Sequence, residues 1–306
     1  MPLLPHPEFR SAPTPEAPLW RYLSLPKFLS LLQQQALYFS SLEYLARSDP
    51  FEGTLPPARF AHRAWKSIEE LPPEVRSKLP DYLKRGETDL DLAFTRLLDF
   101  HELRIRQAYA YRRSFFLNCW HQNEHESAAM WSLYSRANEG IAIVSSEDKF
   151  RLALAATPID VYGGCVQYGD YGSAEFTIDD GNAFRPVLYK RQSFAHEREY
   201  RLVNWDTSVT HKDIDAVNGV FTWEGHIVPD VSGSGRITVG RSESEIEAIK
   251  PTPGIVVPCQ LRELIARVVV SPLAEDWFFD VVAAASSAHG ITVPVERSKL
   301  ADEPLR

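Results

Sequence analysis

Residues 194–201, which read Phe-Ala-His-Glu-Arg-Glu-Tyr-Arg, concentrate side chains that can do chemistry. His196, Glu197 and Glu199 can act as an acid, a base or a hydrogen-bond acceptor near neutral pH. The two arginines of the segment can bind an anion or simply neutralise the glutamates. The segment is therefore interpreted either as a reactive site or as a solvated run of salt bridges.

The apolar pattern of residues 199–205 predicts a strand and assigns these side chains to two faces. Because side chains alternate along a strand, Glu199 and Arg201 share one face, and Arg198 and Tyr200 share the other. Arg201 can then keep Glu199 ionised while the carboxylate faces a cavity. Such a carboxylate is suited to accept a sugar hydroxyl or to stabilise a positive, sugar-like transition state, rather than to donate a proton.

The first two predicted strands carry further candidate residues. Arg21 points away from the face that Trp20 and Tyr22 share. A guanidinium there can hold a diphosphate or a carboxylate through two hydrogen bonds, or it can pair with a structural acid. Ser40 lies at the end of the second strand, where its hydroxyl can bind a ligand sugar or only stabilise its own turn.

Two groups of residues in the middle of the chain offer other ligand sites. Trp131 and Tyr134 lie on nearly one side of a predicted helix, where they can stack on a flat ring or belong to the core. His121 and His125, with Glu124, superficially suggest a divalent metal site. Their order differs from the zincin motif, whose glutamate directly follows the first histidine, so we assign no metal ligand.

Hydrophobic periodicity predicts the elements that must position these residues. Strands are predicted at 19–23, 36–40, 115–120, 141–144, 161–168, 199–205, 219–228, 236–239, 265–270 and 291–295, and helices at 25–35, 125–137, 146–156 and from Pro272 to Gly290. The strands and helices alternate without the regular spacing of a doubly wound sheet. The predicted fold class is α+β, with a mixed, largely antiparallel sheet core and a C-terminal strand-helix-strand.

The composition divides the chain into an N-terminal segment and one domain with two distinct subregions. Residues 1–18 are rich in proline and are expected to be disordered, and residues 19–306 are expected to form a single α+β domain. Helix-forming composition interrupted by prolines predicts an inserted helical subdomain at about 54–113. Residues 207–306 are interpreted as a C-terminal extension.

The composition is that of an ordinary soluble globular protein of 306 residues, with 44% hydrophobic and 24% charged residues. Its net charge of −8 provides no overall attraction to nucleic acid. The three cysteines are odd in number and far apart, which fits neither a disulfide framework nor a paired-cysteine zinc site. We expect a cytoplasmic protein with no export signal and no membrane insertion, because no run approaches about 18 apolar residues.

Several motifs follow one another along the chain, namely Leu19-Trp20-Arg21-Tyr22, Leu37-Tyr38-Phe39-Ser40-Ser41, Asp49-Pro50-Phe51-Glu52-Gly53, Met130-Trp131-Ser132-Leu133-Tyr134 before Glu139-Gly140-Ile141-Ala142-Ile143, and His196-Glu197-Arg198-Glu199-Tyr200-Arg201. In this order and content they resemble a widespread bacterial family of unknown function. The resemblance covers about residues 19 to 206, and it implies no firmly assigned activity.

Fewer residues carry a second likeness, to the ADP-ribosyltransferases. Their common plan has an arginine or histidine on the first strand, a strand ending in serine, and a late catalytic glutamate often written Glu-x-Glu. Arg21, Ser40 and Glu199 occur in this order, with Glu197 completing the acid pair. The resemblance implies that Arg21 contacts the NAD phosphates, Ser40 the nicotinamide ribose, and that Glu199 assists loss of nicotinamide. The sequence departs from the plan because Ser40-Ser41 replaces Ser-x-Ser and because a much longer interval precedes Glu199.

The first functional hypothesis is an NAD-using, ADP-ribosyltransferase-like enzyme, either a transferase or an NAD glycohydrolase. It would act on a protein or nucleic acid, as a toxin or an antiviral defence effector. In this hypothesis Glu199 leads catalysis with Glu197 and His196 in support. NAD, as a substrate, would be bound by Arg21, Tyr22, Ser40, Trp131, Tyr134 and Arg201.

Two alternatives remain open. The protein can be a non-catalytic ligand-binding or protein-interaction module of a bacterial defence or regulatory system, in which the charged cluster is a structural ion network. The third hypothesis is a metal-dependent nuclease that uses His121, His125 and Glu124. If the enzyme hypothesis holds, Arg21, Ser40 and Glu199 should converge on one cleft, since positioned groups must reach the same substrate.

Overall fold

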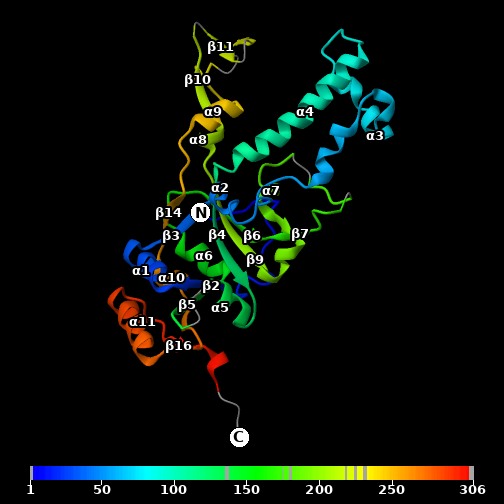
Figure 1. Cartoon of the computed structure of the whole chain (residues 1–306). Helices are drawn as coiled ribbons and strands as arrows, with labels where there is room; N and C mark the ends of the chain where they lie inside the picture. Colours follow the sequence, from blue (N-terminus) through cyan, green and yellow to red (C-terminus); the bar gives the residue numbers. More distant parts are fainter. Residues whose placement is uncertain are drawn as a thin grey trace.

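The computed structural model describes residues 3–134, 138–173, 175–178, 181–217, 219–223, 226–229 and 233–302. Within these residues, ten strands form one sheet (Figure 1). Eight of the described strands follow in the spatial order β1 (Leu3–Leu4), β6 (Val161–Cys165), β9 (Glu199–Trp205), β4 (Phe115–Gln122), β2 (Leu19–Ser24), β5 (Gly140–Ser145), β15 (Arg267–Val270) and β16 (Val295–Arg297). The other two, β3 (Ala36–Ser41) and β14 (Gly254–Pro258), branch from β4.

The sheet is mixed and mostly antiparallel, which confirms the predicted α+β class. β1 pairs with β6 and β15 pairs with β16 in parallel, whereas the other strand pairs of this sheet in the described residues are antiparallel. Short two-stranded sheets join β7 (Gln167–Gly169) to β8 (Tyr189–Arg191), β10 (His211–Asp215) to β13 (Arg236–Gly240), and β11 (Val220–Trp223) to β12 (His226–Pro229).

The helices surround this sheet or project from it. The α-helices are α1 (Leu25–Gln34), α2 (Leu42–Leu45), α3 (Pro73–Arg76), α4 (Leu90–Tyr111), α5 (Ala128–Tyr134), α6 (Glu147–Ala153), α7 (Arg185–Leu188), α8 (Thr207–Thr210), α9 (Glu243–Ala248), α10 (Leu261–Leu264) and α11 (Asp276–Ala288). The 3₁₀ helices are η1 (Pro57–Ala64), η2 (Ile68–Glu70), η3 (Leu79–Tyr82), η4 (Gln192–Glu197) and η5 (Lys299–Ala301). None of the described helices is both long and apolar enough to cross a membrane.

The opening strand-helix-strand is the element group that the sequence predicts most closely. Ser24 is extended at the N-cap of α1 and Pro26 lies in the first turn, where a missing N–H costs nothing. The buried side of α1 includes Phe28 and Leu32, which pack into the main core. Gln35 adopts a left-handed conformation with φ of 49° and ends the helix, so that the chain returns as β3.

The stretch predicted as a helical insertion contains α4 and the short helices before it. Asp89 caps α4 by accepting hydrogen bonds from the backbone of the first turn. Leu71, Leu79 and Leu97 form a small apolar cluster in this region, separate from the main core. Figure 1 shows α4 and α3 extending away from the sheet. The insertion therefore has packing of its own.

The N-terminal residues differ from the expected disordered segment of residues 1–18. Leu3 and Leu4 form β1 on the edge of the sheet, and Leu3, Ala12 and Ala17 are buried in the main core. The prolines of this stretch remove backbone donors, which favours irregular backbone after β1. They do not prevent its apolar side chains from packing.

Residues 207–306, interpreted from the sequence as an extension, contribute to the main sheet. β14 pairs with β3, and β15 pairs with β5. The last predicted strand, at 291–295, is observed at Val295–Arg297, and α11 begins at Asp276 rather than Pro272. The C-terminal region therefore completes the sheet core as well as extending it.

The sheet divides at β4, where two strands share one edge. β2 pairs with residues 121–122 of β4, and β3 pairs with residues 116–117. Between these ladders, the Asn118 amide donates to a carbonyl of β3 at 2.9 Å, and Arg21 Nη1 donates to the Cys119 carbonyl at 2.7 Å. We call this interval, at Asn118 and Cys119, the fork of the sheet.

Candidate functional site

A cavity of about 260 Å³, the main cavity, lies beside the fork and collects residues from distant parts of the chain. β2, β4 and β9 form part of its wall, and α5, β8, η4 and the turn after α2 supply the rest. Of the residues proposed from the sequence, those that line this cavity are Arg21, Tyr22, Tyr134, Glu197, Glu199 and Arg201.

Glu199 and Arg201 form the centre of the site. Strand alternation puts them on one face of β9, while Tyr200 between them packs into the main core. Arg201 Nε lies 2.8 Å from Glu199 Oε1, and Arg201 Nη2 lies 3.0 Å from Oε2. Both side chains are almost fully buried. The predicted shared face of Glu199 and Arg201, with Tyr200 on the other face, is therefore confirmed, whereas Arg198 lies before β9 in a left-handed conformation and is not placed by strand alternation.

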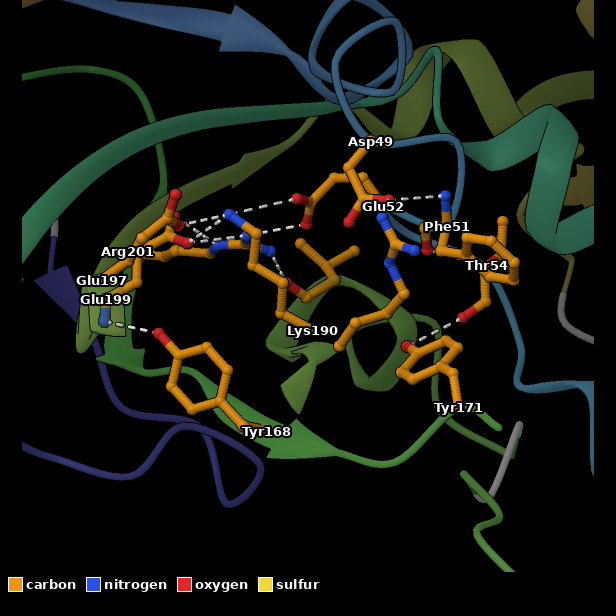
Figure 2. A network of polar contacts seen from close by, with 12 residues as sticks. Asp49, Phe51, Glu52, Thr54, Tyr168, Tyr171, Lys190, Glu197, Glu199 and Arg201 are labelled. Atoms are coloured by element: carbon orange, nitrogen blue, oxygen red, sulfur yellow. Dashed lines mark hydrogen bonds and ion pairs between the residues drawn. The ribbon is translucent and has the colours of Figure 1, made fainter. Parts of the chain in front are cut away.

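Arg201 also holds a second carboxylate, from a part of the chain about 150 residues away. Its Nη2 lies 2.7 Å from Glu52 Oε1, and its Nη1 donates to the Val187 carbonyl. Figure 2 shows Glu52 approaching the arginine from the side opposite Glu199. The guanidinium thus has a partner for each of its nitrogens, which is what a buried arginine requires.

Lys190 of β8 links the three glutamates (Figure 2). Its Nζ lies 2.5 Å from Glu197 Oε2, 3.3 Å from Glu199 Oε2 and 3.6 Å from Glu52 Oε2. We call Glu52, Glu197, Glu199, Lys190 and Arg201 the carboxylate network. Three carboxylates face two cations, so the network carries one net negative charge when all five groups are ionised.

The network keeps Glu199 ionised. Burial raises the pKa of this carboxyl, but attraction to Arg201 and Lys190 outweighs burial and lowers the pKa from 4.5 to about 2. Burial likewise lowers the pKa of Lys190, while Glu199 and Glu52 raise it above its usual value. Glu199 is therefore an anion at neutral pH, as predicted, and it can accept hydrogen bonds but cannot donate a proton.

Tyr134 orients the carboxylate of Glu197, and Tyr168 binds the backbone of Glu199. The Tyr134 hydroxyl donates to Glu197 Oε1 at 2.7 Å, and the backbone N–H of Glu199 donates to the Tyr168 hydroxyl at 2.8 Å. Burial and the nearby Glu197 charge raise the pKa of Tyr134, so this phenol stays protonated and remains a donor. The sequence singles out Tyr134 as a stacking residue, whereas here it also orients a carboxylate.

Arg21 enters the main cavity through the fork. Its guanidinium donates a hydrogen bond to the Cys119 carbonyl and lies 5.9 Å from the centre of the Trp120 ring. Across the described residues, Arg21 forms no ion pair with a carboxylate. Burial lowers the pKa of this guanidinium, which nevertheless stays charged. A partly buried cation without an acidic partner favours the anion-binding interpretation of Arg21 over the structural one.

Three of the proposed residues lie outside the main cavity. Ser40 lines a second cavity of about 530 Å³, and Arg21 is a lining residue of both cavities. Trp131 is buried against Tyr22, with ring centres 4.9 Å apart, so it supports the wall from behind. His196 is exposed, with Nδ1 3.2 Å from the Ser193 carbonyl. The expected convergence of Arg21, Ser40 and Glu199 on one cleft is therefore not found: Arg21 and Glu199 line the main cavity, but Ser40 does not.

The three residues of the metal hypothesis do not converge. His121 lines the main cavity, whereas Glu124 and His125 line a different one near the C-terminal residues. No group of metal-ligating side chains was found in the part of the chain that the structure describes. The nuclease hypothesis therefore gains no support from this geometry.

Two acids of the site, Asp49 and Glu52, were not among the residues selected from the sequence. Both belong to the turn Asp49–Gly53 after α2, which its composition marks only as a turn. Asp49 Oδ1 accepts from Arg191 Nη2 at 2.7 Å, so the turn is tied to the strand that carries Lys190. The signals that could have found them are the two acids within one short turn and the place of this turn among the motifs that carry the family resemblance.

Comparisons with protein families, with curated proteins and with solved structures find no match to this chain.

Proposed function

We propose that the protein is an NAD-using, ADP-ribosyltransferase-like enzyme, a transferase or an NAD glycohydrolase, whose site is the main cavity. One observation carries this proposal: Arg21, a partly buried cation without an acidic partner among the described residues, and Glu199, a carboxylate that is ionised at neutral pH, line the same cavity. NAD has matching chemistry, because it carries an anionic diphosphate and reacts through a sugar that becomes positively charged.

The carboxylate network would act on the bond between nicotinamide and ribose. As this bond breaks, its electron pair leaves with the nicotinamide nitrogen and positive charge develops on the sugar. Glu199, with Glu197 beside it, faces that charge with a net negative field that is already in place before the reaction. Aromatic residues of the wall, among them Tyr22 and Phe194, offer flat surfaces for the leaving ring.

The same hypothesis indicates the acceptor of the reaction and the cellular compartment. A protein or nucleic acid would be the acceptor in a transferase, and water in a glycohydrolase, consistent with a toxin or an antiviral defence effector. All three cysteines are free thiols, which suits the reducing cytoplasm.

The first test is to replace Glu199 by glutamine. Arg201 keeps its contact with Glu52, and the network becomes neutral, so we expect Glu199→Gln to fold. Wild-type protein should bind NAD in calorimetry and release nicotinamide, measured by chromatography. The variant should bind NAD but release nicotinamide about 10²–10³-fold more slowly, the loss typical of a removed transition-state contact.

Glu102→Gln is the matched control, because Glu102 is an ion-paired glutamate of the helical insertion. It should leave both NAD binding and nicotinamide release unchanged. Absence of NAD binding by the wild-type protein at millimolar concentration would contradict the proposal.

A non-catalytic ligand-binding or protein-interaction module is the second candidate function. The observation that favours it is that Glu199 forms ion pairs with both Arg201 and Lys190. A structural ion network has the same arrangement. NAD or another anionic nucleotide that binds without any nicotinamide release, in the wild type as in Glu199→Gln, would establish this candidate instead.

A further inference from the structure

His121 lies on β4 between β2, which carries Arg21, and β9, which carries Glu199. It is paired with Trp20 of β2 on one side and with Glu199 of β9 on the other. Alternation along β4 directs Trp120 into the main core, so His121 points to the opposite face, where it lines the main cavity. Its side chain is buried.

The hydrogen bonds of His121 define which ring nitrogen carries the proton. Nδ1 lies 2.6 Å from the backbone carbonyl of Glu197, and a carbonyl oxygen only accepts hydrogen bonds. The proton of the neutral ring must therefore be on Nδ1, and Nε2 keeps its lone pair. Nε2 is itself buried and has no hydrogen-bond partner among the described residues. A buried lone pair without a partner requires a hydrogen-bond donor, and a ligand in the main cavity can supply one.

The groups around His121 favour its neutral form. Burial lowers its pKa below the usual value, and the Arg198 and His196 side chains act in the same direction. The hydrogen bond to Glu197 and the charge of that carboxylate oppose this shift without reversing it. On the β2 side the neighbouring group is the uncharged Tyr22, with ring centres 6.5 Å apart. His121 is consequently a free base at neutral pH.

We propose that His121 is the general base of the main cavity and that the acceptor it activates is a hydroxyl group, of water or of a macromolecule. This inference rests on the proposed function. As the bond between nicotinamide and ribose C1′ breaks, the acceptor oxygen forms a bond to C1′, and its proton moves to His121 Nε2. The electron pair of the broken bond leaves with nicotinamide, so atoms and charge balance.

The surroundings explain why a neutral hydroxyl is favoured over an anionic nucleophile. The carboxylate network carries one net negative charge, and Glu199 is the direct strand neighbour of His121. A thiolate or carboxylate acceptor would be repelled by these acids. A hydroxyl is neutral, donates to the Nε2 lone pair, and becomes a strong nucleophile only when its proton is removed.

The test uses His121→Asn, whose amide can still donate to the Glu197 carbonyl but lacks the Nε2 lone pair. We expect the affinity for NAD to be unchanged and kcat for nicotinamide release to fall about 10²–10⁴-fold, the usual contribution of a general base. In the wild type, activity should fall as the pH drops through the lowered His121 pKa, because protonation removes the lone pair. This acid limb should be missing in the variant.

His125→Asn is the matched control, because His125 is four residues away, exposed, and lines a different cavity. It should keep the wild-type kcat and acid limb. A second measurement needs no substrate: the ¹⁵N shifts of the His121 ring should show a proton on Nδ1 and none on Nε2 at pH 7.

The possible outcomes separate the two proposals. If the wild-type protein releases nicotinamide but His121→Asn has the same kcat and pH profile, only the role of His121 is overturned. A proton found on Nε2 overturns it as well. If the wild type neither binds nor cleaves NAD, the proposed function fails, and the step assigned to His121 fails with it.

Discussion

Arg201 is the residue on which the charge balance of the site depends. Its side chain is 1% exposed and forms ion pairs with both Glu199 and Glu52, which are also buried. Without it, three carboxylates would face Lys190 alone. Removing one partner from a buried ion pair leaves an uncompensated charge, which costs far more than losing an exposed pair.

We therefore expect Arg201→Met to lower the free energy of unfolding by about 3–5 kcal/mol, as measured by urea denaturation. Arg63→Met is the comparison, because Arg63 forms an exposed ion pair with Glu102 and should lose no more than about 1 kcal/mol. Equal effects of the two substitutions would mean that the network does not depend on Arg201 for stability.

The sequence predicts those site residues whose relation is local. The spacing of Glu199 and Arg201 in a strand is enough to place them on one face. His196 is also near Glu199 in sequence, but Arg198 adopts a left-handed conformation with φ of 40°, and His196, in the 3₁₀ helix before it, is left exposed. Glu52 joins the site only through the tertiary fold, which no local pattern encodes.

At the scale of elements, the fork of the sheet determines which residues line the same cavity. β2 and β3 leave β4 at different points, so Arg21 reaches the main cavity while Ser40 stays on the other branch. Apolar periodicity predicts each of these strands, because it reflects burial along one segment. It does not reveal that two strands share one edge of β4. This is why Arg21 and Ser40, although both lie on strands as predicted, share only the second cavity, whereas Arg21 and Glu199 share the main cavity.

Asn118 closes the fork, and its loss should open it. Its amide donates to the Tyr38 carbonyl at 2.9 Å, and its oxygen accepts from Trp120 Nε1 at 2.6 Å. In Asn118→Ala both groups would be buried and unpaired, at a cost of about 1–3 kcal/mol each in urea denaturation.

Asn204→Ala is the matched comparison for the fork. Asn204 is also buried, on the neighbouring strand β9, and donates one hydrogen bond, to the Asp160 carbonyl at 2.9 Å. Only one group loses its partner there, so the cost should be about half as large. If Asn118→Ala were no more destabilising than Asn204→Ala, the fork would not need its side-chain bridge.

At the scale of the whole molecule, the last hundred residues contain two parts with different relations to the core. β14 and β15 pair with β3 and β5, which come from the first half of the chain. The segment from β10 to β13 instead pairs with itself, and Figure 1 shows it leaving the sheet near α8 and α9. The sequence predicts strands in both parts, but strand patterns alone do not indicate which strands join the main sheet.

Two deletions should separate these parts. A chain ending at Asp206 loses β14 and β15, and with them Val268 and Val270, which are fully buried in the core. It should show no cooperative thermal transition by near-ultraviolet circular dichroism, because β3 and β5 lose strand partners and the core loses apolar side chains.

Removing residues 212–239 should leave the fold intact, because His211 and Gly240 are strand partners that an Asn-Gly turn can join directly. The sheet core would keep all its strands, and the deletion would break the ion pair between Lys212 and Glu245, which lies at the surface and contributes little to stability. The shortened chain should therefore melt cooperatively, close to the full-length protein. If it unfolded like the chain ending at Asp206, the β10–β13 segment would have to be part of the folding unit, and its separate pairing would not reflect independence.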